Sequence, residues 1–298
     1  MPWHVTTDWL SVSKPLAATV LLIVLWTVES VAPMYLERRR RVSHDLANLG
    51  LGLLNILAVA TPFASLMLFV TGWAQDHRFG LAQWTPLPAW TEWIIVLVLF
   101  DAWMYAWHRL NHRVPLLWRF HAVHHSDREM DATSAFRFHT GEIAFSFLAR
   151  LIVLPLLGMT MPQLLVYETI LLPVILFHHS NIRLPARADT AMRWLIVTPW
   201  MHWVHHSNLR PETDSNYASV LSVWDRCFGT YRLRDDPARI EQGLHDEDGG
   251  ARWRTLPQML ISPFTSNGRA AYRRDRGTES DEARRPIHDI NNTNPKDN

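Results

Sequence analysis

The sequence contains almost no cysteine and almost no lysine. Cys227 is the only cysteine among the 298 residues, which excludes an intrachain disulfide, a cysteine-rich zinc site and an iron–sulfur cluster held within the chain. A bound metal would therefore take nitrogen ligands, and electrons would come from another protein or a bound small molecule. Lys14 and Lys296 are the only lysines among 29 basic residues, a bias typical of a GC-rich bacterial genome.

The chain also has little net charge and no recognisable signal peptide. The formal charge is +1, and we expect no nucleic-acid partner. Residues 1–14 have neither a basic start nor a small-residue cleavage site, so no cleavable signal peptide is predicted. The mean hydropathy of −0.06 hides a division, because long apolar runs lie before about residue 180 and the chain after about residue 230 is mostly polar.

The apolar runs have the lengths of membrane spans. Two runs of about the length that a bilayer core requires are Pro15–Leu36, which contains Glu29, and Leu46–Trp73. A third, Trp90–Trp107, carries Glu92 and Asp101. A fourth, Ile143–Phe177, is long enough to cross and return, and the residues near its middle that favour a turn are Pro155, Gly158 and Pro162.

The orientation of these spans follows from Arg38–Arg41, because positively charged loops stay in the cytoplasm. The N-terminus is then outside, and counting the spans brings every histidine cluster to the cytoplasmic side. We expect a multi-pass protein of the bacterial inner membrane with one cytoplasmic metal site. The fold class predicted is all-α, a polytopic membrane protein with a helical, histidine-rich di-metal cap.

Histidines cluster in a repeated pattern. H-x-x-H-H occurs twice, after one H-x-x-x-H, and the members are His108 and His112, then His121, His124 and His125, then His202, His205 and His206. Neutral imidazole is the commonest protein metal ligand, and helix positions i, i+3 and i+4 share one face. We therefore expect each H-x-x-H-H to direct three ring nitrogens to one point, and the whole set to hold two ions.

The remaining histidines are less regular. Of the adjacent His178 and His179, only one is expected to face the site, because neighbouring helix positions diverge by about 100°. His139 is expected to be a further ligand, to support one from outside the ligand set, or to contact a lipid headgroup. Isolated histidines are expected to be ordinary polar residues, and these are His4, His44, His77, His245 and His288.

The ligand type limits the metal. Magnesium and calcium prefer oxygen, and a tetrahedral structural zinc ion would leave half of these histidines idle. Soluble di-iron bundles use Glu-x-x-His ligands, and this sequence lacks that motif. The residues alone favour a dinuclear, nitrogen-rich centre of iron or zinc at a membrane surface.

The order and spacing of further motifs extend from Asp101 to Tyr231. The segments are Asp101-x-x-x-Tyr105-x-x-His108-Arg109-x-x-His112, Leu117-Trp118-Arg119-Phe120-His121-x-x-His124-His125-Ser126, Arg137-x-His139, His179-Ser180-Asn181, His202-x-x-His205-His206, Asn216-Tyr217 and Trp224-Asp225-Arg226-Cys227-Phe228-Gly229-Thr230-Tyr231. This arrangement resembles the membrane-bound fatty acid hydroxylase superfamily, which includes sterol desaturases, C-4 methylsterol oxidases, lipid hydroxylases and alkylglycerol monooxygenase.

The resemblance implies a di-iron oxygenase that uses O2 to hydroxylate or desaturate a lipid. The iron ligands it implies are His108, His112, His121, His124, His125, His179, His202, His205 and His206, with His178 an alternative to His179. The segment from His139 to Glu142 departs from the more usual His-Pro-x-Glu, which weakens a specific role for His139.

Metal-bound imidazoles usually donate their outer N–H to a carboxylate or carbonyl, and the candidates are Asp101, Glu142, Asp214 and Asp225. Asp101 is favoured, because it precedes His108 by about two helical turns and a charge in a span is costly without a partner. It is equally expected to cap or pair with Arg109. Glu29 is expected either to line a channel for a lipid chain or to extend to the membrane interface.

The domains predicted are transmembrane helices over 1–89, a catalytic domain over 90–234, an extension over 235–265 and a disordered tail over 266–298. The extension contains a short apolar stretch, Leu256–Phe264, that is expected to lie on the membrane or on the domain surface. A membrane lipid is the expected substrate. A separate ferredoxin, or a b-type cytochrome with its reductase, is the expected electron donor.

Other functions remain open. A zinc-dependent membrane hydrolase would use metal-bound water and need no reductant. A haem protein with paired histidines as axial ligands is opposed by the three histidines in each segment. A membrane protein with one structural metal would not need this many ligands.

Overall fold

The computed structural model describes residues 3–35, 41–244 and 253–265, with only the backbone of residues 3–15. The described chain is almost entirely helical and contains isolated β-bridges but no strand. The prediction of an all-α protein is therefore confirmed. The predicted tail, 266–298, lies outside the described residues, as do His245 and His288.

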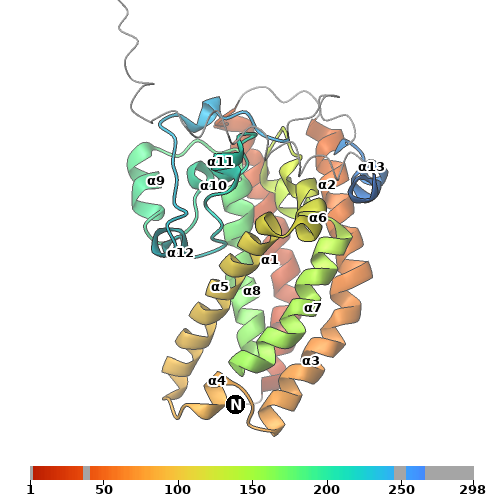
Figure 1. Cartoon of the computed structure of the whole chain (residues 1–298), viewed down its shortest axis with the longest axis vertical. Helices are drawn as coiled ribbons and strands as arrows, with labels where there is room; N and C mark the ends of the chain where they lie inside the picture. Colours follow the sequence, from red (N-terminus) through yellow and green to blue (C-terminus); the bar gives the residue numbers. More distant parts are fainter. Residues whose placement is uncertain (1–2, 36–40, 245–252, 266–298) are drawn as a thin grey trace, which may run out of the picture.

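Long helices form an elongated bundle (Figure 1). They are α1 (Trp3–Val31), α2 (Arg41–Asn55), α3 (Thr61–Asp76), α5 (Ala89–Arg113), α7 (Thr140–Leu157) and α8 (Met161–His179). A π-helical turn, Ile56–Ala60, joins α2 to α3 without a break. The bundle packs around buried apolar side chains such as Phe100, Leu154 and Tyr167.

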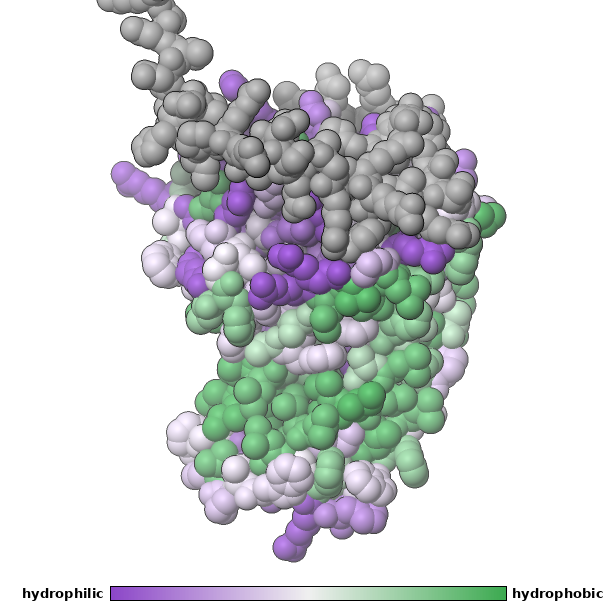
Figure 2. Space-filling model, viewed as in Figure 1, coloured by the Kyte–Doolittle hydropathy of each residue, from purple (hydrophilic) through white to green (hydrophobic). Residues whose placement is uncertain are grey.

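Four helical segments of the described chain are long and apolar enough to cross a membrane, and they are Arg41–Trp84, Ala89–Arg113, Thr140–Leu157 and Met161–His179. They contain the second and third predicted spans and the two arms of the predicted hairpin. The first predicted span differs, since α1 ends at Val31 and its described apolar part, Leu16–Val31, is shorter than the others. Hydrophobic surface covers most of this half of the molecule on the face shown in Figure 2.

The hairpin between α7 and α8 turns where its sequence predicts. Gly158 ends α7 in the left-handed conformation, with φ of 69°, which a residue without Cβ adopts at little cost. Thr160 then begins α8 with a capping box to Gln163, and Pro162 lies in its first turn. The start of α7 and the end of α8 therefore lie at the same end of the bundle.

Short helices cover one end of the bundle (Figure 1). These are α6 (Pro115–His125), η2 (Ala132–Phe136), α9 (Ala186–Met192), α10 (Pro199–His205), α11 (Arg210–Thr213), α12 (Val223–Cys227), η3 (Pro237–Arg239), α13 (Leu256–Ile261) and η5 (Ser262–Phe264). The short α4 (Leu81–Trp84) lies at the opposite end. The cap carries most of the hydrophilic surface in Figure 2.

Glu29 joins α1 to the cap. Its side chain is buried, and its Oε1 accepts hydrogen bonds from the backbone N–H groups of Ala132 and Asn181, each at 2.8 Å. Both sequence expectations for Glu29, a channel lining and extension to the interface, are therefore wrong. The carboxylate instead satisfies backbone donors that burial would otherwise leave without an acceptor, and one of these lies two residues after His179.

The apolar stretch Leu256–Phe264 lies on the domain surface. Met259 is buried in a cluster with Leu51 and Trp118, whereas Ile261 and Phe264 are 59% and 61% exposed. Arg119 donates two hydrogen bonds to the Pro263 carbonyl. The stretch is therefore fastened to the cap by one face and leaves an apolar face outside.

Candidate metal centre

Four helices bring the clustered histidines together. His108 and His112 lie on the last turns of α5, and the Val114–Pro115 step leads directly into α6. His179 is the last residue of α8. Thr198 caps α10, with Pro199 in its first turn, so that His202 and His205 lie on one short helix followed by His206.

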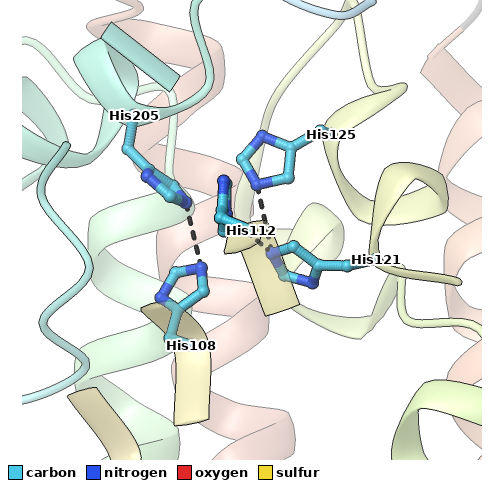
Figure 3. Close-up of side chains that lie close together, drawn as sticks. All are labelled: His108, His112, His121, His125 and His205. Carbon is cyan, nitrogen blue, oxygen red and sulfur yellow. Dashed lines mark hydrogen bonds between the residues drawn. The ribbon is translucent and has the colours of Figure 1, made fainter. Parts of the chain in front are cut away.

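The nine histidines form two groups rather than one. The five-histidine group contains His108, His112, His121, His125 and His205, and the four-histidine group contains His124, His179, His202 and His206. Within each group the potential ligand atoms all lie within 4.8 Å of one another. Figure 3 shows the rings of the five-histidine group facing a common centre.

Each H-x-x-H-H segment is divided between the two groups. His121 and His125 contribute to the five-histidine group, while His124 between them contributes to the other. The second segment is divided in the opposite sense, since His202 and His206 join the four-histidine group and His205 does not. The expectation that each segment directs three nitrogens to one point is therefore wrong, because adjacent helical residues diverge by about 100°.

The rings approach through their Nε2 atoms. In the five-histidine group the Nε2 atoms of His205 and His108 lie 3.0 Å apart, and those of His121 and His112 lie 3.1 Å apart. In the four-histidine group the Nε2 atom of His202 lies 3.1 Å from the Nε2 atom of His179 and 3.1 Å from that of His206. Such convergence of ring nitrogens is the donor set that an imidazole-ligated metal requires.

Backbone carbonyls fix the tautomer of several rings. Nδ1 of His108 lies 2.8 Å from the Tyr217 carbonyl, and Nδ1 of His205 lies 2.6 Å from the Ser215 carbonyl. A carbonyl can only accept, so both Nδ1 atoms carry the proton and both Nε2 atoms present a lone pair in the neutral ring. Two lone pairs 3.0 Å apart repel unless a cation lies between them, and these residues therefore fit a metal ion.

Carboxylates lie beside two more members of the five-histidine group. Glu142 accepts from Nδ1 of His121 at 2.7 Å, and Asp214 Oδ1 lies 3.4 Å from Nδ1 of His112. Carboxylates in this position raise the basicity of a metal-bound imidazole and fix its orientation. Glu142 thus has the geometry of its predicted supporting role, whereas Asp214 lies near His112 without a hydrogen bond to it.

The four-histidine group has fewer such contacts. Nδ1 of His179 lies 2.8 Å from the Ile175 carbonyl, but Nδ1 of His124, His202 and His206 has no hydrogen-bond partner among the described residues. Two of these rings are instead stacked on neighbours. Phe138 lies against His124 with centroids 4.2 Å apart, and His178 lies against His202 with centroids 4.0 Å apart.

Burial favours the neutral form of five of the clustered histidines. Burial, followed by the neighbouring histidines, lowers the pKa well below the usual value for His124, His125, His202, His205 and His206. A neutral imidazole keeps the lone pair that binds a metal. The donor set therefore suits iron, copper, nickel or zinc, and it does not suit magnesium or calcium.

His178 and His139 lie outside both groups. His178 stacks on His202, and its neighbour His179 is the group member. Nδ1 of His139 accepts from the backbone N–H of Gly141 as the cap of α7, and its Nε2 lies 3.1 Å from the Leu260 carbonyl. His139 therefore joins the start of α7 to α13, and it belongs to neither histidine group.

Asp101 does not support a histidine. It accepts hydrogen bonds from Tyr167 at 2.6 Å, from the backbone N–H of Leu221 at 3.0 Å and from Trp224 at 2.8 Å. Both expectations for this residue, contact with His108 and pairing with Arg109, are wrong. The carboxylate fastens α5 and α8 to the cap loop that contains Leu221 and Trp224.

Asp225 contacts the histidines only through the Tyr217 backbone. It accepts from the backbone N–H groups of Tyr217 and Ala218 at 2.7 and 3.0 Å and from the Thr230 hydroxyl at 2.7 Å. The Tyr217 carbonyl is the acceptor for His108. Asp225 therefore positions the loop that orients this ring, although it contacts no ring of the two groups.

Sequence reasoning missed a polar network beside the site. His44 lies between Asp127, 2.8 Å from its Nε2, and Asp45, 3.2 Å from its Nδ1. Arg137 donates to the Val123 carbonyl and to Asn48. This network joins α2 to the chain around His124, and only the Asp127 that follows the first H-x-x-H-H segment could have suggested it.

The helices and the histidine groups together define a class, a helical membrane protein with a candidate dinuclear centre of nitrogen ligands. The family model described as fatty acid hydroxylase matches residues 93–230. Over this segment the chain is similar to the fatty acid hydroxylase family, in agreement with the resemblance that its sequence motifs carry. No solved structure matches the chain.

Curated relatives carry the names of lipid-modifying enzymes. The chain is 28% identical over 230 residues to the ornithine lipid hydroxylase OlsE of Rhizobium tropici, covering 76% of this chain and 66% of that protein. It is 27% identical over 236 residues to human alkylglycerol monooxygenase, covering 76% and 49%. It is 31% identical over 155 residues to mouse cholesterol 25-hydroxylase, covering 49% of each. The matches thus span between half and two thirds of these relatives.

Proposed function

We propose that this protein is a di-iron oxygenase of the membrane that hydroxylates or desaturates a lipid. The single observation that carries the proposal is the convergence of nine histidine Nε2 atoms in two adjoining groups at the end of apolar helices. The named relatives are hydroxylases and monooxygenases of lipids, which favours oxygen chemistry over a zinc-dependent hydrolase.

Two iron ions are the proposed occupants, one in each histidine group. When bound, they would supply the redox chemistry that activates O2 for attack on an unactivated C–H bond. Hydroxylation consumes one O2, two electrons and two protons for each C–H bond, and it yields an alcohol and water. Desaturation uses the same O2, electrons and protons, but it removes two hydrogens from the substrate and releases two waters.

The chain's own residues would orient the ligands and exclude water. Glu142 and the Tyr217 and Ser215 carbonyls hold the Nδ1 atoms, so each ring presents Nε2 inward. Trp118 lies against His112 and His125, with centroids 5.0 and 5.4 Å away. Burial of these rings restricts water, which protects a reactive centre from side reactions.

The electrons would come from a separate protein. Cys227 is the only thiol in the chain and is exposed, so the chain cannot hold an iron–sulfur cluster of its own. A ferredoxin, or a b-type cytochrome with its reductase, is the proposed donor. The Arg38–Arg41 block favours a cytoplasmic position for the site in a bacterial inner membrane, where such donors are available.

The test is oxygen incorporation by purified protein in nanodiscs. The protein is supplied with bacterial lipids, a ferredoxin and its reductase under ¹⁸O2, and the lipids are analysed by mass spectrometry. The proposal expects either a lipid that gains one ¹⁸O atom or a lipid that loses two hydrogens, in each case only when reductant is present. A product that forms without O2 and reductant would instead support the hydrolase.

A further inference from the structure

A second site lies on the cap, away from the ring nitrogens of both histidine groups. A surface cavity of about 430 Å³ lies between the start of α2 and the segment that begins α13. Residues from α2, from the chain after His125 and from the start of α13 line it, among them Leu46, Arg128, Arg137 and Arg254. None of these residues belongs to the metal groups.

The charge of this cavity is positive. Arg128 and Arg254 are exposed side chains of its lining, and Arg137 is buried with 3% of its surface exposed. Asp127 also lines the cavity, but its carboxylate is held by His44, whose two ring nitrogens both face carboxylates. Both nitrogens must therefore donate, which makes His44 a cation. Among the described residues of the lining, Glu129 is the only other acid, so the cations exceed the acids there.

An exposed apolar stripe leads down from the cavity. Val42, Leu46, Leu53 and Leu57 are 70%, 65%, 57% and 63% exposed and follow a helical period along α2 and the turn after it. Leu46 belongs both to this stripe and to the cavity lining. The stripe lies on a segment apolar enough to cross a membrane, so its leucines contact lipid chains, and the arginines above it lie at headgroup level.

We propose that the cavity binds the phosphate of an anionic glycerophospholipid whose acyl chain lies along the α2 stripe. Basic pockets at the end of transmembrane helices recognise such headgroups through charge-assisted hydrogen bonds. Arg137 also donates to the Val123 carbonyl, Asn48, Ser126 and the Trp253 carbonyl, which leaves one of its five N–H groups for a phosphate oxygen. The bound lipid would therefore contact the segment that carries His124 and His125 through this guanidinium.

The first test uses the whole protein in detergent and needs no variant. The thermal midpoint is measured with added phosphatidylglycerol, phosphatidylcholine or inorganic phosphate at equal phosphate concentration. A rise with phosphatidylglycerol alone is expected. Equal effects of both lipids would overturn the proposal, because the cavity would then not select an anionic headgroup. An equal effect of inorganic phosphate would identify a free-phosphate site instead.

The second test counts retained lipid by native mass spectrometry in Arg128→Ala/Arg254→Ala. Each arginine near an anionic lipid contributes a factor of about five, so retention of phosphatidylglycerol is expected to fall on the order of ten-fold or more. The matched control is Arg183→Ala/Arg187→Ala, which removes two exposed cap arginines outside the cavity. Equal retention in both double variants would refute the site. Lipid retention can be measured on metal-free protein as well, so its outcome does not depend on whether the protein is an oxygenase.

Discussion

The two histidine groups differ in how their rings are held. In the five-histidine group, Glu142 and Asp214 and two backbone carbonyls lie beside the outer nitrogens. In the four-histidine group, only His179 has such a contact, and aromatic stacking holds His124 and His202. Nδ1 of His112 and His125 has no hydrogen-bond partner among the described residues either, so three of five rings are held in one group and one of four in the other. Outer contacts fix ring orientation and raise basicity, so we expect the five-histidine group to bind metal more tightly.

The largest effect expected is the loss of one ligand from either group. His205→Ala and His124→Ala each remove a ring nitrogen from one group, and each should lower turnover by more than about 100-fold, because one of the two ions would then lose a ligand. Turnover is measured together with membrane insertion. His77→Ala, at the other end of the bundle, is the control. Full activity in either ligand variant would show that its histidine is not required.

Glu142→Gln and Phe138→Leu compare the metal affinities of the two groups. Glu142→Gln removes the negative charge beside His121 and should cost about 10–100-fold in metal affinity at the five-histidine group. Phe138→Leu removes only a stacked ring beside His124, and we expect less than about a 10-fold change. Affinity is measured by chelator competition. A larger loss from Phe138→Leu would reverse the ranking of the two groups.

Asp225 makes the stability of the folded protein dependent on pH. Burial raises the pKa of Asp225 from 3.8 to about 6, so the folded protein holds this proton more tightly than the unfolded chain. The stabilisation is complete below the unfolded pKa and is lost as pH rises through the folded pKa. At about 1.4 kcal/mol per pKa unit, the loss is about 3 kcal/mol at most.

Thermal midpoints of the wild type and Asp225→Asn, measured in detergent from pH 4 to 7, check this expectation. The wild type should lose stability relative to the variant as pH rises through this range. Parallel pH profiles for the two proteins would mean that Asp225 does not titrate there.

The smallest effect is expected at His178. This ring stacks on His202 but belongs to neither group, so His178→Ala should keep both metals and lose less than about 10-fold in turnover. His179→Ala, one residue away, should lose metal from the four-histidine group. Metal content of the two variants, side by side, distinguishes a ligand from a neighbour. Loss of metal from His178→Ala would place it in the ligand set.

The fold follows from the sequence where one physical rule decides it. Apolar runs longer than a bilayer core predict the spanning helices, and Gly158 between two apolar arms predicts the hairpin turn. The histidine motifs identify eight of the nine members of the two groups, and the ninth, His179, comes from the family resemblance, with His178 as its alternative.

The sequence could not predict which atoms hold these residues. The carbonyls of Tyr217 and Ser215 that orient two rings are backbone atoms, which every residue has. Asp101 and Glu29 are buried charges whose partners come from distant segments, and periodicity along one helix cannot identify such partners. The division of each H-x-x-H-H segment could have been foreseen, since the 100° step between neighbours already separates His124 from His125.

Both histidine groups are proposed to hold iron, and elemental analysis of the detergent-purified protein measures the metal that they bind. Expression in iron-rich, zinc-depleted medium should yield about two irons per chain, one for each histidine group. Zinc with negligible iron under the same conditions would contradict the claim and make oxygen chemistry at this site untenable.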